Sequence, residues 1–565
     1  MKIHPTADFP QQRASLALAL LLLVALTAVA MLSRPLTPID ETRYVSVAWE
    51  MWLRGDFLVP FKNGEPYSHK PPLMMWMFQA GWAVFGVNEW WPRLVSPLFS
   101  AGGLLLTIGL ARRLWPDRPG LGGQAVLILA SSLLWTIFST SAMFDVILAF
   151  FVLLGMHGTL MAADGKSGRG LALLGLAIGL GVLAKGPVIL LHVLPVAALA
   201  PWWNRGLPDK GTPSFKGLTP VKSRLKWTRW YAGILAAVLL GAAIALAWAI
   251  PAGLSGGEEY RNAIFWGQTA NRMVESFAHR RPFWWYLPLL PLLLFPWFVW
   301  PGLWRAIRQY TQQGLDRGGR FCIAWMLPVF VAFSLISGKQ VHYLVPLFPA
   351  FALLAARAMA NGARIAGMWL PVLLALLVGV TLLLLALGWV KLPHDKLPEL
   401  PTLWPGLVLI LGGAAAYFLG RRFPRPLLVL SLLGAAFPAL LQLALAWPFY
   451  PAYDVRPMAH AIHRAQASGH EVAHDGRYHD QYQFLGRLEQ PLVELQGGAF
   501  DDWLKQHPNG CAVVYVKNLE RLQGVSVIAS QRYRGVAAAL VDAQTALKLL
   551  RARETPEAPD TQEQE

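Results

Sequence analysis

Long apolar runs of about twenty residues, separated by short polar stretches, fill most of the chain up to residue 449. A helix of this length is what is needed to cross the hydrocarbon core of a bilayer. The pattern therefore predicts about thirteen transmembrane helices, with junctions near Ala142 and Gly186 that can be turns between spans or kinks within them. The predicted spans are 14–32, 92–111, 121–140, 144–162, 170–185, 187–203, 231–250, 284–304, 321–337, 342–360, 366–390, 403–420 and 427–449.

Two shorter apolar stretches lie between the first and second predicted spans. In "DETRYVSVAWEMWLRG", apolar residues recur at helical spacing and Gly55 ends the run, which predicts an amphipathic helix over 41–54. A second helix is expected over 72–85, with Trp76 and Trp82 as anchors. Both are too short to cross a bilayer, so we expect two interfacial helices along the outer surface.

The polarity pattern changes after residue 450. "CAVVYV" and "VSVIAS" are typical of short buried strands, and "GVAAALVDAQTALKLLRAR" favours a helix. We therefore divide the chain into a transmembrane domain (1–449), a small α/β domain (450–550) and a disordered tail (551–565).

Composition supports a membrane protein and charge orients it. Of 565 residues, 55% are hydrophobic and only 14% are charged, whereas a soluble domain has about a quarter charged. The net charge of +17 does not indicate nucleic-acid binding, because basic residues cluster at the ends of apolar runs. An N-terminus in the cytoplasm places every strongly basic loop inside and the C-terminal domain outside. The two cysteines, Cys322 and Cys511, are far apart, and neither a disulfide nor a cysteine metal site is expected.

This threading brings unusual polar residues to the outer side of the membrane. Ionisable groups at membrane depth are costly and are usually paired or functional. Here cations outnumber acids, which favours an anionic ligand such as a phosphate. The residues of interest are Asp40, Glu41, Lys70, Asp145, Lys185, Arg280, Arg281, Lys339, His342 and Tyr343.

Structural explanations remain open for several of these residues. Asp145 and Lys185 can form an ion pair between helices, and Asp40 can cap the helix that follows it. One of Arg280 and Arg281 can be a solvated loop charge. Three histidines, His69, His279 and His342, can be isolated, or His69 and His279 can help to hold a divalent metal.

The motifs, taken in order, resemble a known family. They are "DETRYVSVAWEMWLRGDFLVPFKNGEPYSHKPPLMMWM", "MFDVILAFFV", "GVLAKGPVIL", "FWGQTANRMVESFAHRRPFWWYLPLLPLLLFPW" and "SGKQVHYLVPLFPA". They resemble the bacterial aminoarabinose transferases, which belong with the protein O-mannosyltransferase relatives among the GT-C glycosyltransferases. The resemblance covers roughly residues 15–360 and implies a GT-C-type helical bundle.

The resemblance also implies roles for residues at matching positions. Asp40 matches an essential acid, with Glu41 beside it, and Arg43 a neighbouring site residue. Tyr67, Lys70 and Arg280 or Arg281 match residues that hold the lipid phosphate, and the nearby Lys339 is grouped with them. Asp145, Lys185 and Tyr343 match later members of the site, next to His342. The family often has an acid where this chain has His69, which weakens the expectation of a metal.

The implied function is transfer of a sugar from a polyprenyl-phosphate donor on the periplasmic face of the bacterial inner membrane. The acceptor can be lipid A, with 4-amino-4-deoxy-L-arabinose as the sugar, or another sugar and envelope acceptor in the same family. No cofactor is required, and no Gly-rich nucleotide loop is present in the sequence. A transporter is a more distant alternative, but no internal repeat supports it.

Overall fold

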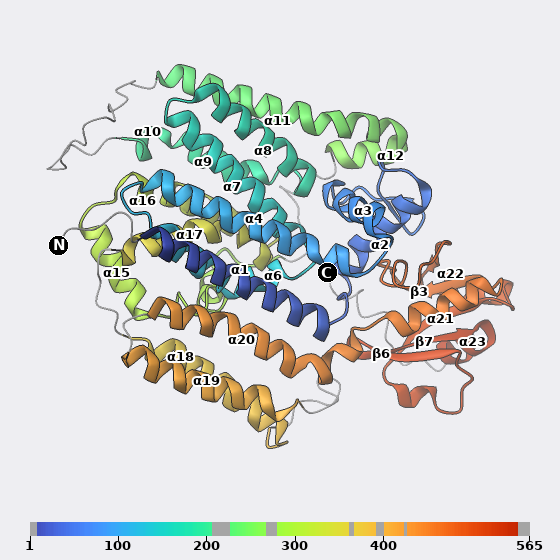
Figure 1. Cartoon of the computed structure of the whole chain (residues 1–565). Helices are drawn as coiled ribbons and strands as arrows, with labels where there is room; N and C mark the ends of the chain where they lie inside the picture. Colours follow the sequence, from blue (N-terminus) through green and yellow to red (C-terminus); the bar gives the residue numbers. More distant parts are fainter. Residues whose placement is uncertain are drawn as a thin grey trace.

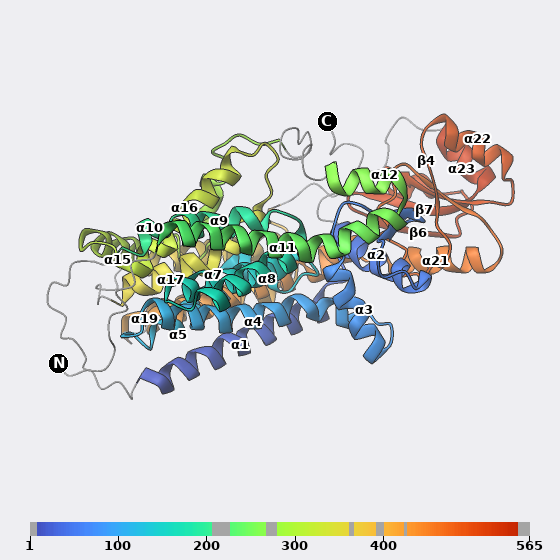
Figure 2. The ribbon, with the colours of Figure 1, turned by 90° about the horizontal axis from the view of Figure 1, so that it is seen from above.

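The structure is a computed structural model that describes residues 8–205, 226–266, 280–360, 367–390, 401–422 and 426–551. A bundle of long helices makes up most of the molecule, and a small α/β domain lies at one end of the bundle (Figure 1). The same arrangement, with the α/β domain beyond the helix ends, is visible from above in Figure 2.

Ten helices of the described part are long and apolar enough to cross a membrane. A bent pair, α5 (Leu121–Ala130) and α6 (Leu133–Ser139), adds an eleventh span if counted as one. The ten spans lie in α1 (Asp8–Ser33), α4 (Trp90–Leu114), α7 (Phe144–Ala163), α8 (Ser167–Lys185), α11 (Trp227–Ser255), α16 (Arg317–Leu335), η3 (Val341–Leu347) with α17 (Phe348–Met359), α18 (Trp369–Ala386), α19 (Leu403–Arg422) and α20 (Pro426–Phe449).

Two predicted spans are broken by proline. The segment 187–203 forms α9 (Ile189–Ala198) and α10 (Ala200–Trp203), and 284–304 forms η2 (Leu287–Leu289), α14 (Leu290–Leu293) and the start of α15 (Pro301–Gln312). Proline lacks an N–H donor and clashes with the preceding turn, so it interrupts a helix that apolar composition alone would favour. The count of about thirteen thus becomes ten or eleven spans plus two broken segments. The junctions near Ala142 and Gly186 are turns between helices.

The bend between α5 and α6 has identifiable partners. The two helices meet at 72°, at Ser131 and Ser132. Across the break, the Leu133 N–H donates to the carbonyl of Phe295 at 3.1 Å, and Trp297 Nε1 donates to Ser131 Oγ at 3.2 Å. Groups freed from the helix are therefore satisfied by the proline-broken segment, as an apolar environment requires.

The two helices predicted in the first outer loop are present. They are α2 (Asp40–Arg54) and α3 (Leu73–Phe85), and Gly55 ends α2 in the left-handed conformation at φ 65°. Between them, β1 (Phe61–Lys62) and β2 (Glu65–Pro66) form a hairpin.

The C-terminal domain covers part of these helices, a contact that the sequence did not predict. Ser46 Oγ donates to the carbonyl of Asp480 at 2.7 Å, and Trp49 Nε1 donates to that of Leu488 at 3.0 Å. Trp82, expected to be a membrane anchor, is 1% exposed and stacks on Phe484 with ring centroids 5.2 Å apart. Contacts between segments more than 400 residues apart thus decide the burial of α2.

The C-terminal domain is a five-stranded mixed sheet with helices on both faces. Its strand order is β4-β3-β5-β7-β6, parallel from β4 to β5 and antiparallel beyond. The strands are β3 (Val472–Asp475), β4 (Val493–Leu495), β5 (Cys511–Val516), β6 (Ala529–Tyr533) and β7 (Val536–Asp542). The helices are α21 (Arg456–Ala467), α22 (Gly498–Gln506) and α23 (Ala543–Arg551), with short 3-10 turns η4 (Tyr450–Ala452) and η5 (Leu519–Leu522).

The predicted elements of this domain are partly confirmed. "CAVVYV" is β5, the central strand, and every residue in it is buried. The predicted helix begins only at Ala543, because its first half, Val536–Asp542, is the strand β7. Of "VSVIAS", only the last two residues enter β6. The proposed tail from 551 lies outside the described residues after Arg551.

The end of the bundle opposite the α/β domain gathers basic side chains. Asp164 pairs with Arg113 at 3.8 Å and with Arg317 at 2.7 Å, and Asp316 pairs with Arg357 at 2.7 Å. These pairs join the ends of α4, α7, α16 and α17, so loops assigned to the cytoplasm by charge meet at one end. A short helix, α12 (Gly257–Asn262), follows α11, and its Tyr260 packs with Val59 from the segment after α2.

Candidate active site

Asp40 opens α2 and faces two partners from the next turn. Residues three and four positions apart share a helix face, so Arg43 and Tyr44 lie beside it. Asp40 Oδ1 pairs with Arg43 Nη2 and accepts a hydrogen bond from the Tyr44 hydroxyl at 3.1 Å. The side chain makes no capping bond but remains 46% exposed, so the capping expectation is wrong and the carboxylate is open to a ligand.

Asp40 is held in its charged form. Partial burial alone raises its pKa, but Arg43, the Tyr44 hydroxyl, Lys70 and His342 together lower it below its usual value. Lys70 and His342 come from other segments of the chain, so their effect on Asp40 shows that the fold brings them near it. At neutral pH the site therefore presents an ionised carboxylate among cations.

A second group lies where α7, α8 and η3 meet. Lys185 forms an ion pair with Asp145, and its ammonium lies 5.3 Å from the centre of the Tyr343 ring. The rings of His342 and Tyr343 are 4.9 Å apart. His342 lies in the combined field of Asp145, Lys185, Asp40 and Lys70, which joins this group to the first. The expected interhelical pair Asp145–Lys185 is present, and it forms one wall of the site.

Lys70 and Tyr67 approach from the segment between the hairpin and α3. The Lys70 ammonium lies 6.0 Å from the centre of the Phe144 ring. Phe144 is the residue before Asp145 in the sequence. Tyr67 is 6% exposed and stacks on His69 with ring centroids 5.3 Å apart. Lys70 therefore lies near both Asp40 and the start of α7, and its binding of a phosphate stays a prediction.

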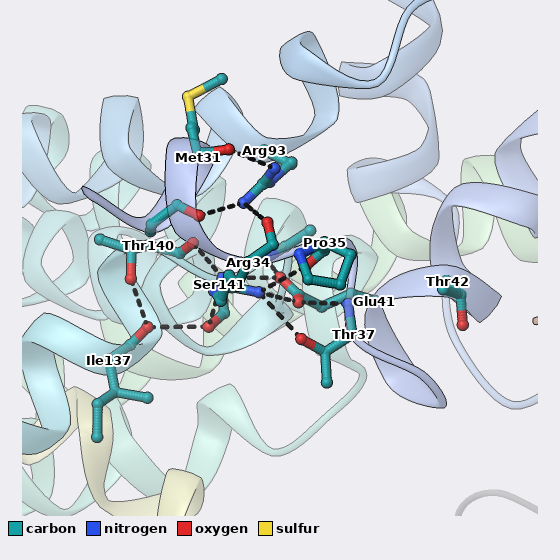
Figure 3. Close-up of polar contacts among 12 residues, drawn as sticks. Met31, Arg34, Pro35, Thr37, Glu41, Thr42, Arg93, Ile137, Thr140 and Ser141 are labelled. Atoms are coloured by element: carbon teal, nitrogen blue, oxygen red, sulfur yellow. Dashed lines mark hydrogen bonds and ion pairs between the residues drawn. The ribbon is translucent and has the colours of Figure 1, made fainter. Parts of the chain in front are cut away.

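Glu41 has a different environment from its neighbour. It is 4% exposed and forms an ion pair with Arg34, whose Nη2 lies 3.2 Å from Glu41 Oε1 (Figure 3). Its carboxylate also accepts the N–H groups of Thr37 at 3.0 Å and Ala142 at 2.7 Å. These contacts tie the start of α2 to the turn before α7. They support a positioning role for Glu41 in place of the expected catalytic one.

Three expected phosphate ligands have contacts of their own outside the Asp40 and Asp145 groups. Lys339 is 2% exposed and its ammonium donates to the carbonyls of Arg281, at 2.9 Å, and Ile336. Arg280 and Arg281 are both exposed, and the Arg281 guanidinium lies 5.9 Å from the Trp285 ring. Lys339 therefore fastens the 280–281 segment to the end of α16, a structural use of a residue expected in the site.

The metal expectation receives no support from the described residues. No group of three or more His, Cys, Asp and Glu side chains in them could hold a metal ion. His69 is exposed and stacked on Tyr67, and His279 lies outside the described residues.

The structure adds residues that sequence analysis did not single out. A cavity of about 200 Å³ lies beside the site, between α2, the hairpin and the C-terminal domain. Arg43, Tyr67 and His69 line it together with Lys62, Arg477 and His479. The run "DGRYHD" after a buried strand was the available signal, because polar residues at the carboxyl end of a strand often form sites.

Comparisons with known proteins agree with this arrangement. The family described as dolichyl-phosphate-mannose-protein mannosyltransferase matches residues 69–210. The chain is 32% identical over 419 residues, 71% of each protein, to the undecaprenyl phosphate-alpha-4-amino-4-deoxy-L-arabinose arabinosyl transferase of Pseudomonas aeruginosa (strain LESB58). It is 32% identical to the transferase of the same name from Edwardsiella ictaluri, over 56% of the chain and 54% of the relative.

Solved structures show the same fold. ArnT from Cupriavidus metallidurans in the apo state superposes with a TM-score of 0.70 at 20% identity, covering 94% of this chain and 99% of that one. The same protein bound to undecaprenyl phosphate gives 0.68 at 21% identity, covering 93% and 97%. The helical bundle with its α/β domain is thus that of a multi-pass GT-C glycosyltransferase. Within that class, the chain belongs to the bacterial aminoarabinose transferase family.

Proposed function

We propose that this glycosyltransferase moves 4-amino-4-deoxy-L-arabinose from a polyprenyl-phosphate donor to a phosphate of lipid A. The observation that carries the proposal is the meeting of Asp40, Arg43 and Lys70 with the Asp145–Lys185 pair at one end of the bundle. These residues come from separate segments and make a mainly cationic site with one open carboxylate. The names of the relatives supply the sugar and the undecaprenyl phosphate of the donor.

Lys70 and Arg43 act on the donor phosphate. In the reaction, the bond between the sugar C1 and the donor phosphate oxygen breaks, and its electron pair leaves with the polyprenyl phosphate. Cations placed beside that oxygen stabilise the charge that develops on it. Lys70 can do so because it is half-buried beside Phe144, where water screens its charge less than in bulk.

The state of Asp40 favours a phosphate as the acceptor. A general base works best when its pKa lies near the working pH, whereas the pKa of Asp40 is below that of an ordinary aspartate. Asp40 is therefore better suited to stabilise positive charge on the sugar ring than to remove a proton. An acceptor phosphate needs no such removal, since its ionised oxygen forms the new bond to C1 directly.

The site is proposed to face the periplasm from the inner membrane, with the N-terminus in the cytoplasm. The basic ends of α4, α16 and α17 at the opposite end of the bundle support this orientation. Lys185 and Asp145 complete the wall against which the sugar would lie.

Mass spectrometry tests the proposal directly. Lipid A and lipid-linked sugars are compared in cells with and without the gene, and the purified enzyme is assayed with the isolated donor. We expect lipid A carrying one added aminopentose only when the gene is present, and accumulation of the lipid-linked sugar when it is deleted. Addition of a different sugar to lipid A would contradict the proposed donor sugar. An unmodified lipid A together with another glycosylated envelope molecule would contradict the proposed acceptor.

A further inference from the structure

The cavity beside Asp40 is built by two parts of the chain that are distant in sequence. The hairpin supplies Lys62 and Glu65, and the C-terminal domain supplies Arg477 and His479. Arg43 also lines it, and Arg43 is the ion-pair partner of Asp40. Any group held in the cavity would therefore lie next to the proposed reaction centre.

The lining is fixed in place by hydrogen bonds across the domain junction. Asn63, at the hairpin turn, donates from Nδ2 to the carbonyl of Leu492 at 2.8 Å and accepts the Leu492 N–H at 2.8 Å. The Lys62 ammonium donates to the carbonyl of Tyr478 at 2.8 Å, which holds it beside Arg477 and His479. A preorganised site of this kind loses little side-chain entropy when a ligand binds.

The charge of the lining is positive. Arg43, Lys62 and Arg477 bring three cations, against the single exposed carboxylate of Glu65. Burial, followed by the fields of Arg43, Lys62 and Arg477, lowers the pKa of His479 to about 3. The imidazole is therefore neutral at neutral pH, and the positive charge of the lining comes from Arg43, Lys62 and Arg477.

We propose that this cavity binds the phosphate of the acceptor, and that Arg477 of the C-terminal domain determines the preference for a phosphorylated acceptor. The inference rests on the proposed function and names where its second substrate binds. Lys62 and Arg477 are not among the residues assigned to the donor phosphate, so their charge can serve the second phosphate of the reaction. Arg477 and His479 of the lining belong to the α/β domain, and that domain lies beyond the helix ends (Figures 1 and 2).

Two observations favour a phosphate over a carboxylate or a neutral sugar. Arg477 has a planar fork of donors, and Lys62 adds a point charge, which together suit an oxygen-rich anion. The volume of about 200 Å³ admits a phosphate with part of the sugar that carries it, but not a whole lipid.

Steady-state kinetics of the full-length enzyme tests the inference. Arg477→Gln, Lys62→Gln and the control Arg464→Gln, an exposed α21 residue of the same domain, are compared with the wild type. We expect the KM for lipid A to rise about tenfold or more in the Arg477 variant, as loss of one charge-assisted contact implies, and less in the Lys62 variant. Arg477→Lys should recover part of the loss. The Kd for polyprenyl phosphate should stay within about twofold of the wild type.

The probes separate the possible occupants. Inorganic phosphate should compete with lipid A in the wild type and lose that effect in the Arg477→Gln variant, and dephosphorylated lipid A should be a poor acceptor for both. Weakened polyprenyl-phosphate binding in that variant would assign the cavity to the donor. An unchanged KM for lipid A in an active variant would remove Arg477 from acceptor binding while leaving the proposed function intact. Failure of the wild type to modify lipid A, despite binding the donor, would overturn the proposed function and this assignment together.

Discussion

Asp40 and Glu41 are adjacent acids whose surroundings separate their roles. Asp40 is 46% exposed, pairs with Arg43 and accepts a hydrogen bond from Tyr44. Glu41 is buried, pairs with Arg34 and accepts hydrogen bonds from two backbone N–H groups. A helix turns by about 100° per residue, so neighbours point to different faces. Glu41 thus fixes the helix start on which Asp40 depends.

Asp40→Asn should reduce sugar transfer by about a hundredfold or more, because it removes charge while keeping shape. Donor binding should change little, since Lys70 and the other cations remain. Transfer and polyprenyl-phosphate affinity are measured separately on purified protein. Asp502→Asn, at an exposed acid on α22 that pairs with Lys505, is the matched control and should behave as the wild type. A near wild-type transfer rate in the Asp40 variant would remove this residue from the reaction.

Lys70→Ala should weaken polyprenyl-phosphate binding by about tenfold or more and slow turnover further. Loss of one charge-assisted contact in a partly desolvated site corresponds to roughly 1.5–3 kcal/mol. Lys70→Arg should restore part of the affinity, because charge matters more than shape for a single phosphate. Lys548→Ala, at an exposed position on α23, controls for the loss of a lysine. Unchanged affinity in the Lys70→Ala protein would indicate that this side chain only anchors the loop at the membrane surface.

At the scale of elements, two buried carboxyls hold the hairpin, Asp480 from the C-terminal domain and Glu50 from α2. Asp480 Oδ2 accepts the Asn63 N–H at 3.1 Å, and Glu50 Oε2 accepts the Gly64 N–H at 3.0 Å. Burial raises the pKa of both groups, and the field of Glu50 raises that of Asp480 further. The lysine and arginine nearby, Lys62 and Arg54, offset this only in part.

The sign of the resulting pH effect follows from proton binding. Above the ordinary values of 4.5 for Glu50 and 3.8 for Asp480, the docked state holds protons that the separated state has lost. The stability of docking is therefore complete below these values and falls as pH rises through the window up to the raised pKa values. Each proton involved contributes a slope of at most about 1.4 kcal/mol per pH unit.

Asp480→Asn should flatten this dependence and strengthen docking at alkaline pH. Hydrogen exchange of the hairpin and of residues 480–492 in wild type and variant, from about pH 5 to about pH 9, measures it. Burial lowers the pKa of His474 to about 4 and that of His479 to about 3, so their contribution to docking changes with pH in the opposite direction. Both histidines are present in the wild type and in the variant, so this contribution cancels when the two proteins are compared. Equal slopes for the two proteins would mean that Asp480 carries no extra proton in the docked state.

Local patterns in the sequence were sufficient for elements but not for their surroundings. Helical spacing and Gly55 placed α2 within one residue of its bounds, and an unbroken apolar run identified β5. Contacts between distant segments bury Trp82 under Phe484, hold the Lys339 ammonium at the Arg281 carbonyl and place Arg477 in the lining of the cavity. Periodicity reports which face of an element is apolar, and it carries no information about which partner will cover that face.

At the scale of the whole molecule, the fold forces the site and the C-terminal domain to one side of the membrane. Ser46 and Trp49 of α2 bond directly to residues 480 and 488, so the domain cannot lie on the other face from Asp40. A single topology measurement therefore locates both. It also decides between the periplasm, where lipid A phosphates would meet the donor, and the cytoplasm.

Alkaline phosphatase fused near residue 460 should be active, because that enzyme works only in the periplasm. A fluorescent protein that folds only in the cytoplasm should show no fluorescence when it is fused at the same place. The expectation follows from the basic residues Arg113, Arg317 and Arg357, which gather at the opposite end of the bundle, because basic loops generally stay on the cytoplasmic side during insertion. Fusions near residue 118, in a loop of that basic end, provide the matched control and should give the reverse pattern. If the two fusions exchanged their signals, the basic end would face outward and Asp40 would face the cytoplasm. The donor sugar would then have to be used on the inner leaflet, and an acceptor phosphate exposed only in the periplasm would be out of reach.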